Sequence, residues 1–355
     1  MAELLSVSTA VPAHRVTAAE TKRYLADHLS ETSAQRYCRM VDASGIENRH
    51  SVVRTEDLFQ LQTLEERSRE YTRHAVTLGQ RVASDALSAA NVTPAAVTSV
   101  IPISCTGHMM PSLDAHLVNT LRLSATSRRI PITLLGCSAG VGALGLAAEL
   151  LRPGEAQVAL VTSVELCSLC LQVAEPSPAD VVGAILFGDG AAAAVIAAEP
   201  SGRGPELLAS RSVLWPDTMD ELGMRLTSTG FRFVLSPSLP RVVRARLLPA
   251  VEDFLGGVGF TMDDVRFHVI HPGGPKILDA AAASLRLTDR ALRPSYEVWQ
   301  RFGNLSSATV FFILRQLQES APPSPGELGL MLAFGPGVTC EMVLLRAGGW
   351  LSGQG

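Results

Sequence analysis

PITLLGCSAGVGALG, residues 131–145, joins a run of apolar residues to a segment made almost entirely of small residues. An apolar run that ends at a glycine predicts a buried strand over residues 130–135. The small residues that follow predict a helix over residues 138–151 that can pack closely against neighbouring backbone. A second apolar strand is predicted over residues 157–163, so this part of the chain has the strand–helix–strand pattern of an α/β fold.

The same alternation of apolar strands with amphipathic or alanine-rich helices extends along the chain in both directions. Helices should cover both faces of the resulting sheet, because the strands are apolar on both sides. The predicted elements are, in chain order, a helix over 74–91, a strand over 97–104, a helix over 239–255, a strand over 265–270, a helix that begins at residue 275, a helix over 305–317, a strand over 328–334 and an apolar run over 338–345.

Two glycine turns suggest an internal repeat. FGDG at residues 187–190 is followed by AAAAVIAA, and FGPG at residues 334–337 is followed by VTCEMVLL. Two copies of one unit would explain the similarity, whereas two unrelated hairpins would explain it equally well. Residues 200–220 are the best candidate for a linker, and we therefore predict an N-terminal unit over 1–210 and a C-terminal unit over 211–355.

The composition is that of a globular protein with a large core. The chain has 355 residues, of which 47% are hydrophobic and 18% are charged, and its formal net charge is -4. These values exclude disorder as the main state. Because there is no overall positive charge, nucleic acid and anionic membrane surfaces are disfavoured as partners, and small molecules or proteins are favoured.

The sequence has no predicted targeting or membrane segment. The N-terminal MAELLSVSTAVPAHRV has neither a basic region before a long apolar stretch nor a small-residue cleavage site. Residues 181–198 are almost wholly apolar, but the sequence Gly188-Asp189-Gly190 interrupts them and predicts two buried segments around a turn. We therefore expect a cytoplasmic protein whose six cysteines are reduced.

Cys137 is the strongest candidate for a nucleophile. It lies between a predicted strand and a predicted helix, so its thiol would face the free N–H groups and the positive dipole end of the helix. Both features favour the thiolate, which is the reactive form of cysteine at neutral pH. The alternative is an inert cysteine that only fills space in the core.

Two further polar residues occupy similar junctions. His271 follows a predicted strand and precedes PGGP, and Asn304 lies just ahead of a predicted helix. Polar groups at the carboxyl ends of strands can meet in one crevice of an α/β sheet. Taken singly, His271 is also compatible with a structural role and Asn304 with a helix cap. Together with Cys137 they match the residue set of nucleophilic catalysis.

Two other motifs suggest different chemistry. The glycines of GVGALG, residues 140–145, have the spacing of a dinucleotide-binding loop, and Glu165 lies near the end of the next strand, so an NAD-dependent oxidoreductase is a competing hypothesis. The three residues between Gly136 and this loop lengthen the turn that would present the pyrophosphate, which weighs against NAD. Cys167 and Cys170 have the spacing of half a zinc site, but the sequence offers no second pair, which favours simple packing.

Four motifs lie around the candidate residues: LLGCSAGVGAL, VIHPGGPKILD, FGNLSSATVFFIL and AFGPGVTCEMVLL. In this order they closely resemble the chalcone synthase-like type III polyketide synthases. The resemblance is specific because four separate stretches agree, and it extends from about residue 5 to about residue 346. It implies an α/β thiolase-like fold, which is a duplicated αβαβα five-layer arrangement that would account for the repeated glycine turns. It also implies a homodimer.

The resemblance implies the chemistry of an acyltransferase. Cys137 would take an acyl group from a thioester, and His271 would hold Cys137 as a thiolate by pairing with it as an imidazolium. His271 and Asn304 would also bind the thioester oxygen of a malonyl-type extender, whose loss of CO2 gives an enolate. The enolate would attack the acyl-cysteine on the way to a pyrone- or resorcinol-type product. No cofactor is implied beyond the CoA or phosphopantetheine thioesters that serve as substrates.

The resemblance also implies a set of substrate-binding residues. Phe187 and Phe233 would lie between the entry tunnel and the cavity, and Cys105 and Cys170 would line the cavity. Met110 would reach across the dimer interface, and Arg36 and Arg39 would contact the CoA phosphates. Gly335 belongs to the C-terminal glycine turn.

Two positions depart from the family pattern. Ala43 stands where a third basic residue contacts the CoA phosphates, which leaves room for substrates delivered on acyl carrier proteins. An alternative function is therefore a ketosynthase that joins two carrier-bound β-ketoacyl chains into an α-pyrone. Ala333 replaces the first glycine of the C-terminal turn and would place a methyl group in the cavity wall. A noncatalytic subunit of a synthase complex is a third hypothesis, which the complete set of candidate catalytic residues argues against.

Overall fold

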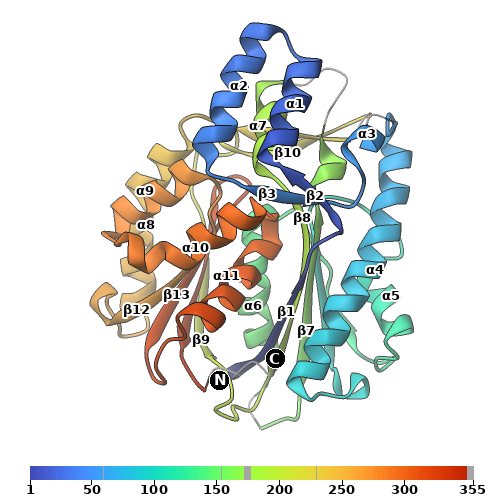
Figure 1. Ribbon diagram of the computed structural model, residues 1–355. Coiled ribbons are helices and arrows are strands. Elements are labelled where there is room, and N and C mark those ends of the chain that lie inside the picture. The colour runs from blue at the N-terminus through green and yellow to red at the C-terminus, as the bar shows by residue number, and fades with distance from the viewer. Residues whose placement is uncertain (59, 153, 172–176, 229, 350–355) are drawn as a thin grey trace.

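One mixed sheet runs through the middle of the protein (Figure 1). The computed structural model describes residues 1–349 except 59, 153, 172–176 and 229. The strands of the main sheet are β1 (Ala2–Ala10), β4 (Ser99–Ser104), β5 (Arg128–Arg129), β6 (Ile132–Thr133), β7 (Val158–Leu166), β8 (Asp189–Ala197), β9 (Glu206–Leu214), β12 (Val265–Ile270), β13 (Leu328–Gly335) and β14 (Thr339–Arg346). Their order is β12-β13-β14-β9-β1-β8-β7-β4-β5, and β6 also pairs with β4.

Helices cover the sheet, and two small hairpins lie at one end of it. The helices are α1 (Ala18–His28), α2 (Glu31–Ser44), α3 (Thr55–Leu58), α4 (Leu64–Ala90), α5 (Leu113–Thr120), α6 (Ala139–Leu150), α7 (Pro178–Leu186), α8 (Leu239–Gly256), α9 (Pro275–Leu285), α10 (Asp289–Phe302) and α11 (Thr309–Ser320). Short 3₁₀ turns are η1 (Pro94–Ala96), η2 (Gly136–Ser138), η3 (Cys167–Cys170), η4 (Met262–Asp264) and η5 (Ser306–Ala308). The hairpins pair β2 (His14–Thr17) with β3 (Asn48–Ser51), and β10 (Leu222–Thr227) with β11 (Gly230–Leu235).

The sheet contains the same strand arrangement twice. In the first half β1 and β7 are antiparallel to β8, and β4 is parallel to β7. In the second half β9 and β13 are antiparallel to β14, and β12 is parallel to β13. The two predicted glycine turns lead into β8 and β14, which are equivalent strands of the two halves. The predicted duplication is therefore confirmed, although α7 precedes the first turn whereas β13 precedes the second.

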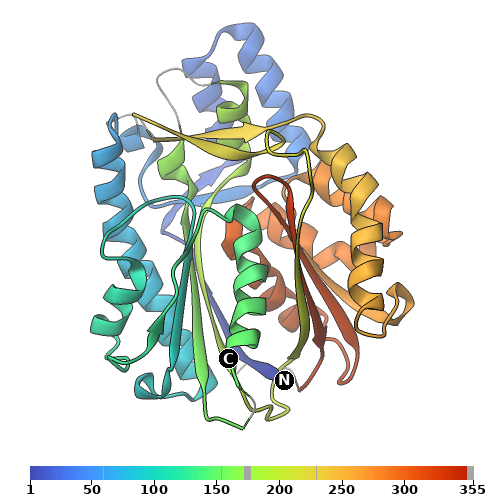
Figure 2. The same cartoon turned by 180° about the vertical axis from the view of Figure 1, so that it is seen from behind.

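Five layers follow from this duplication (Figures 1 and 2). One core cluster joins α4 and α5 to the outer face of the first half, and another joins α8 and α9 to the outer face of the second half. The largest cluster lies between the halves, where α6 and α11 are buried. In β13 the side chains alternate between the inner and the outer cluster, because successive residues of a strand point to opposite faces. The fold is the predicted α/β thiolase-like arrangement.

Two sequence predictions about chain organisation are wrong. The predicted linker over 200–220 contains β9, which pairs with β14 along its whole length and with β1 at one end, so it belongs to the sheet. A division after residue 210 would cut through this strand; the position of the boundary itself remains a prediction. The predicted strand over 130–135 is reduced to β6, because the chain turns away after Thr133.

Local sequence signals explain where the helices near the carboxyl ends of the strands begin. Thr17, Thr63 and Ser177 each accept a hydrogen bond from a backbone N–H in the first turn of α1, α4 and α7, and an acidic side chain three residues later completes a capping box. Pro178 also fits the first position of α7, where its missing N–H costs no hydrogen bond. The helices α1, α2 and α7 thereby cover one end of the sheet (Figure 1).

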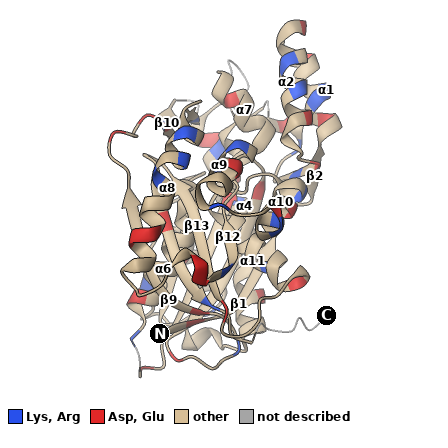
Figure 3. Ribbon diagram, turned by 90° about the vertical axis from the view of Figure 1, so that its left-hand side faces the viewer, with Lys and Arg blue, Asp and Glu red and all other residues tan. Residues whose placement is uncertain are grey.

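Charge is confined mainly to the helices and loops of the surface, and the strands behind them are largely uncharged (Figure 3). Among the described residues, no helix is both long enough and apolar enough to cross a membrane. The apolar segment at 181–198 forms the end of α7 and all of β8, as two buried segments around a turn.

Candidate active site

Cys137 lies in η2, at the start of the buried helix α6. Leu134 and Gly136 have φ values of 69° and 55°, which turn the chain sharply out of β6 and into η2. A side chain at Gly136 would place its Cβ 2.6 Å from Cδ of Pro336, so only glycine fits this turn. The thiol of Cys137 is thereby directed to the end of the sheet that α7 and the β10–β11 hairpin cover.

Asn304 occupies the corresponding place in the second half, just before η5 and α11. Its backbone forms a bridge around Phe187: its N–H donates to Leu186 O at 2.8 Å, and its carbonyl accepts from the N–H of Gly188 at 2.9 Å. Its side-chain Oδ1 accepts from the N–H of Ser306 at 2.8 Å and lies 4.0 Å from Sγ of Cys137. The amide is therefore fixed next to the thiol.

His271 lies at the carboxyl end of β12 and is 1% exposed. Its N–H donates to Leu332 O of β13 at 2.9 Å. Three residues further along β13, Gly335 packs directly against Ser138 beside Cys137, so this strand connects the positions of the histidine and the cysteine. Neither ring nitrogen of His271 has a hydrogen-bond partner in the described part of the chain, which leaves both for a ligand.

A cavity of ≈ 400 Å³, which we call the reaction cavity, opens above Cys137. Its lining is mainly apolar, as expected for a pocket that holds a hydrophobic substrate. Residues from both halves and from the β10–β11 hairpin line it, namely Cys105, Thr106, His108, Leu134, Gly136, Cys137, Cys167, Phe187, Leu222, Gly223, Met224, Leu226, Phe231, Phe233, Leu235, Ser306 and Pro336.

Burial sets the protonation of the candidate catalytic residues. Loss of water raises the pKa of Cys137 to about 12, although hydrogen bonds with Ser306 and Asn304 act in the opposite direction. Loss of water also lowers the pKa of His271 to about 3. In the empty site, loss of water disfavours the charged form of each group on its own, and the thiolate–imidazolium pair stays a prediction.

A buried carboxyl group accepts hydrogen bonds from residues that surround this site. Glu165 in β7 is fully buried, and it accepts hydrogen bonds from Thr106 Oγ1 at 2.8 Å, from the N–H of Cys105 at 3.1 Å, and from the hydroxyls of Ser306 and Ser307. Burial raises its pKa. Sequence reasoning assigned Glu165 only to a nucleotide site, although a charged residue inside an apolar strand already signals a polar network.

The glycine spacing that suggested NAD has a packing function. A Cβ at Gly140 would collide with Ser307 O of η5, and a Cβ at Gly145 would lie 2.7 Å from Cβ of Ser210 in β9. Gly142 faces Glu341 of β14 in the same way, at 3.3 Å. These glycines let α6 approach the second half closely, and they leave no room for a pyrophosphate. The dinucleotide-loop interpretation is therefore wrong.

Comparison with known proteins assigns the family. Residues 1–200 match the N-terminal domain of chalcone and stilbene synthases, and residues 206–348 match their C-terminal domain. The chain belongs to the chalcone and stilbene synthase family. Its 1,3,6,8-tetrahydroxynaphthalene synthase relative from Streptomyces peucetius is 37% identical, with 96% of this chain and 92% of the relative covered. A phloroglucinol synthase from Pseudomonas fluorescens is 31% identical, with 94% and 95% covered.

Solved structures agree with this assignment. The crystal structure of 1,3,6,8-tetrahydroxynaphthalene synthase from Streptomyces coelicolor, a bacterial type III polyketide synthase, superimposes with a TM-score of 0.93 at 33% identity, and covers 98% of this chain and 99% of that one. As a member of the family, this protein is a type III polyketide synthase, which is an acyltransferase of the ketosynthase type.

The two phenylalanines that the family resemblance singled out form one barrier. The rings of Phe187 and Phe233 are stacked, with centroids 4.7 Å apart and an interplanar angle of 4°, and both residues line the reaction cavity. Cys105 also lines it, with its Sγ 3.3 Å from the hydroxyl of Ser306.

Two further cysteines of this chalcone and stilbene synthase family member, Cys167 and Cys170, lie near the site. Cys167 lines the reaction cavity, whereas Cys170 is buried behind the lining, with its Sγ 3.3 Å from Thr106 O. Cys170 packs in one apolar cluster with Cys167, Phe187 and Phe233, and its role in the cavity lining stays a prediction. Among the described residues, no cluster of three or more His, Cys, Asp or Glu side chains could hold a metal.

Other family positions lie away from the reaction cavity. Met110 is 99% exposed, and Arg36 and Arg39 are exposed on α2. Gly335 does not line the cavity, but lets β13 approach Ser138 so closely that any side chain would collide. Ala333 faces the core between the two halves rather than the cavity wall, so its methyl group is a packing feature.

Proposed function

We propose that this type III polyketide synthase condenses acyl thioesters through an acyl group carried on Cys137. The observation that carries the proposal is the place of this thiol, on the lining of the reaction cavity and in contact with Asn304 and Ser306. Of the cysteines that line the cavity, Cys137 alone lies at the start of a buried helix and beside an amide that could bind a thioester oxygen.

Loading of the starter requires only a proton acceptor. As the sulfur of Cys137 bonds to the thioester carbonyl carbon, the neutral His271 takes the thiol proton. The carbon–sulfur bond to the carrier then breaks, and His271 returns the proton to the leaving thiolate. A neutral imidazole can accept this proton, whereas an imidazolium could not.

Chain extension uses the same groups as oxyanion donors. A malonyl-type thioester loses CO2, and the electron pair of the broken carbon–carbon bond becomes an enolate whose oxygen is held by His271 and Asn304. The enolate carbon attacks the acyl carbonyl on Cys137, the sulfur leaves as thiolate, and the chain is longer by two carbons. No redox cofactor is needed, because these steps exchange carbon–carbon and carbon–sulfur bonds and transfer protons without a net oxidation or reduction.

The product class and the partners are also part of the proposal. The relatives named for tetrahydroxynaphthalene and phloroglucinol favour a small aromatic or pyrone-type polyketide here. Substrates would arrive as CoA or phosphopantetheine thioesters, with Arg36 and Arg39 exposed on α2 to meet phosphates. The exposed Ala43 in the same helix keeps delivery by an acyl carrier protein, including α-pyrone formation from two carrier-bound chains, as the second candidate. A homodimer would cover Met110.

Mass spectrometry of the intact protein tests the central step. Incubation with an acyl-CoA starter should add one acyl mass that maps to Cys137 and disappears in Cys137→Ala. Cys105→Ala removes the other thiol that lies close to Ser306, and this variant should still be acylated. An adduct that survives Cys137→Ala would contradict the proposal. Parallel incubation with acyl-carrier substrates would show which form of thioester the enzyme accepts.

A further inference from the structure

A second apolar cavity lies on the other side of Phe187 from the reaction cavity. It measures ≈ 310 Å³ and lies between α1, β3 and α7; we call it the α1–α7 cavity. Cys137, His271 and Asn304 are not among its lining residues. Its apolar surface comes mainly from α1, α3, η3 and α7, through Leu25, Leu29, Leu58, Leu171, Val181 and Ala184.

The α1–α7 cavity adjoins another cavity on each of two sides. Phe187 is the one described residue that lines both this cavity and the reaction cavity, and so lies between them. On the outer side, Val16 and Thr55 are shared with a polar surface basin of ≈ 620 Å³ that also contains Arg15 and Arg23. A ligand could therefore enter the α1–α7 cavity either past Phe187 or directly from the surface.

Buried polar groups keep the α1–α7 cavity open. The guanidinium of Arg49, itself 7% exposed, donates to Phe187 O at 3.1 Å, to Thr21 Oγ1 at 2.6 Å and to Ala184 O, and so holds α1 and α7 apart at a fixed spacing.

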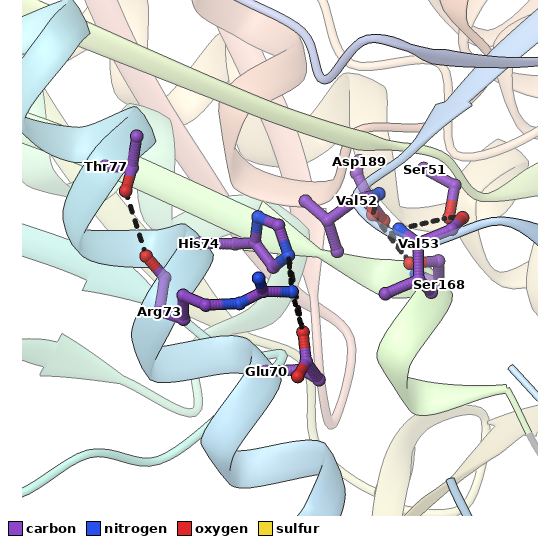
Figure 4. Close-up of polar contacts among 9 residues, drawn as sticks. All are labelled: Ser51, Val52, Val53, Glu70, Arg73, His74, Thr77, Ser168 and Asp189. Atoms are coloured by element: carbon purple, nitrogen blue, oxygen red, sulfur yellow. Dashed lines mark hydrogen bonds and ion pairs between the residues drawn. The ribbon is translucent and has the colours of Figure 1, made fainter. Parts of the chain in front are cut away.

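Asp189 fixes the opposite side of the cavity. Its carboxylate accepts from the N–H of Val52 at 2.8 Å and from the N–H and hydroxyl of Ser168 at 2.7 and 2.6 Å (Figure 4). Ser168 and the neighbouring Ser51 both line the cavity. The hydrogen bonds of Arg49 and Asp189 thus frame the space, and Oδ1 of Asp180, which also lines it, has no hydrogen-bond partner in the described residues.

We propose that the α1–α7 cavity binds an aliphatic acyl chain. Its apolar lining offers contacts for methylene groups, and each methylene removed from water strengthens binding by about fourfold. The chain has two conceivable sources. It is either the tail of a long starter that passes Phe187, or a free fatty acid whose carboxylate stays hydrated in the basin. The first source rests on the proposed function, and the second does not.

Calorimetry with dodecanoate tests the site itself. Ala184→Leu inserts bulk into the α1–α7 cavity from α7 and should weaken dodecanoate binding tenfold or more. Ala184→Ser, at the same position with nearly the same size, should bind like the wild type. Phe233→Trp fills the reaction cavity alone and should also retain binding. Leu29→Trp is a second filling variant, from α1, in case Ala184→Leu does not fold.

The outcomes separate the site from adventitious binding. Equal affinity in all variants, or loss of binding only in Phe233→Trp, would overturn the proposal. A chain-length series then separates the two sources. If the starter's tail occupies the cavity, Ala184→Leu lowers kcat/KM for dodecanoyl-CoA at least tenfold but leaves hexanoyl-CoA unchanged. If a free fatty acid occupies it, both starters are unaffected while dodecanoate binding is lost. Failure of every CoA and carrier thioester to form an acyl adduct on Cys137 would contradict the proposed function and leave the dodecanoate result standing.

Discussion

Desolvation governs the chemistry of single residues at this site. Cys137 sits where a helix terminus would favour a thiolate, yet burial raises its pKa to about 12. The ring nitrogens of His271 have no hydrogen-bond partner in the described residues, and burial lowers the pKa of this histidine to about 3. Burial therefore favours the neutral form of each group in the empty site, and we expect proton transfer from sulfur to imidazole to accompany substrate binding.

The pH dependence of thiol alkylation tests this view. Because the pKa of Cys137 lies near 12, its thiolate fraction in the empty enzyme should grow about tenfold for each pH unit between 8 and 10. The rate of carboxamidomethylation of the peptide that contains Cys137 should grow in the same way, without a plateau. A plateau below pH 8 would mean that His271 ionises the thiol in the absence of substrate.

At the level of elements, the site is built from one motif used twice. A 3₁₀ turn followed by a buried helix carries Cys137 in the first half, as η2 and α6, and follows Asn304 in the second half, as η5 and α11. Gly140 allows the two motifs to touch, because any side chain there would collide with Ser307 O. The contact between α6 and η5 therefore fixes how far the thiol lies from the amide.

Gly140→Ala should loosen this contact. Overpacking of a close contact costs about 1–3 kcal/mol, so the free energy of unfolding measured in urea should fall by that amount and acylation of Cys137 should slow. Gly256→Ala at the end of α8 is the matched control, since its Cβ would meet no atom within 4 Å. Equal effects of the two substitutions would contradict a special role for the α6–η5 contact.

At the level of the whole molecule, the two halves share one sheet and one central cluster, so stability depends on groups buried between layers. His268 in β12 is 5% exposed, and neither ring nitrogen has a partner in the described residues. Burial lowers its pKa to about 4. Because the folded-state pKa lies below the unfolded value near 6.5, the unfolded state gains the proton first as pH falls.

This histidine should make the protein sensitive to acid. Its contribution to stability is complete above pH 6.5 and is lost as pH falls towards 4, by about 3 kcal/mol. Urea unfolding at pH 7 and pH 4 should show that the wild type loses this much more stability than His268→Phe. Asp189 and Glu165 have raised pKa values, so their contributions to stability change with pH in the opposite direction. Both proteins contain these residues, so their contributions cancel in the comparison. Identical losses in both proteins would refute the role of His268.

The sequence by itself determined the fold class, the duplication and the candidate catalytic residues. Hydrophobic periodicity is a local property, so it located the buried helices α6 and α11 and several core strands, and motifs such as LLGCSAGVGAL are specific enough to indicate Cys137, His271 and Asn304. The thiolase-like architecture and the acyltransferase family followed from the same motifs. Errors arose where pairing with a distant strand mattered, as in β9, which looked like a linker.

Only the tertiary structure decided the burial of the candidate catalytic residues, the roles of the glycines and the network of Glu165. Each depends on which atoms approach from distant parts of the chain: solvent exclusion around Cys137, the carbonyl of Ser307 against Gly140, and hydroxyls gathered around Glu165. A pKa or a steric limit is set by its three-dimensional surroundings, and no local pattern encodes them. The α1–α7 cavity behind Phe187 was likewise visible only in the tertiary structure, because residues from distant parts of the sequence line it.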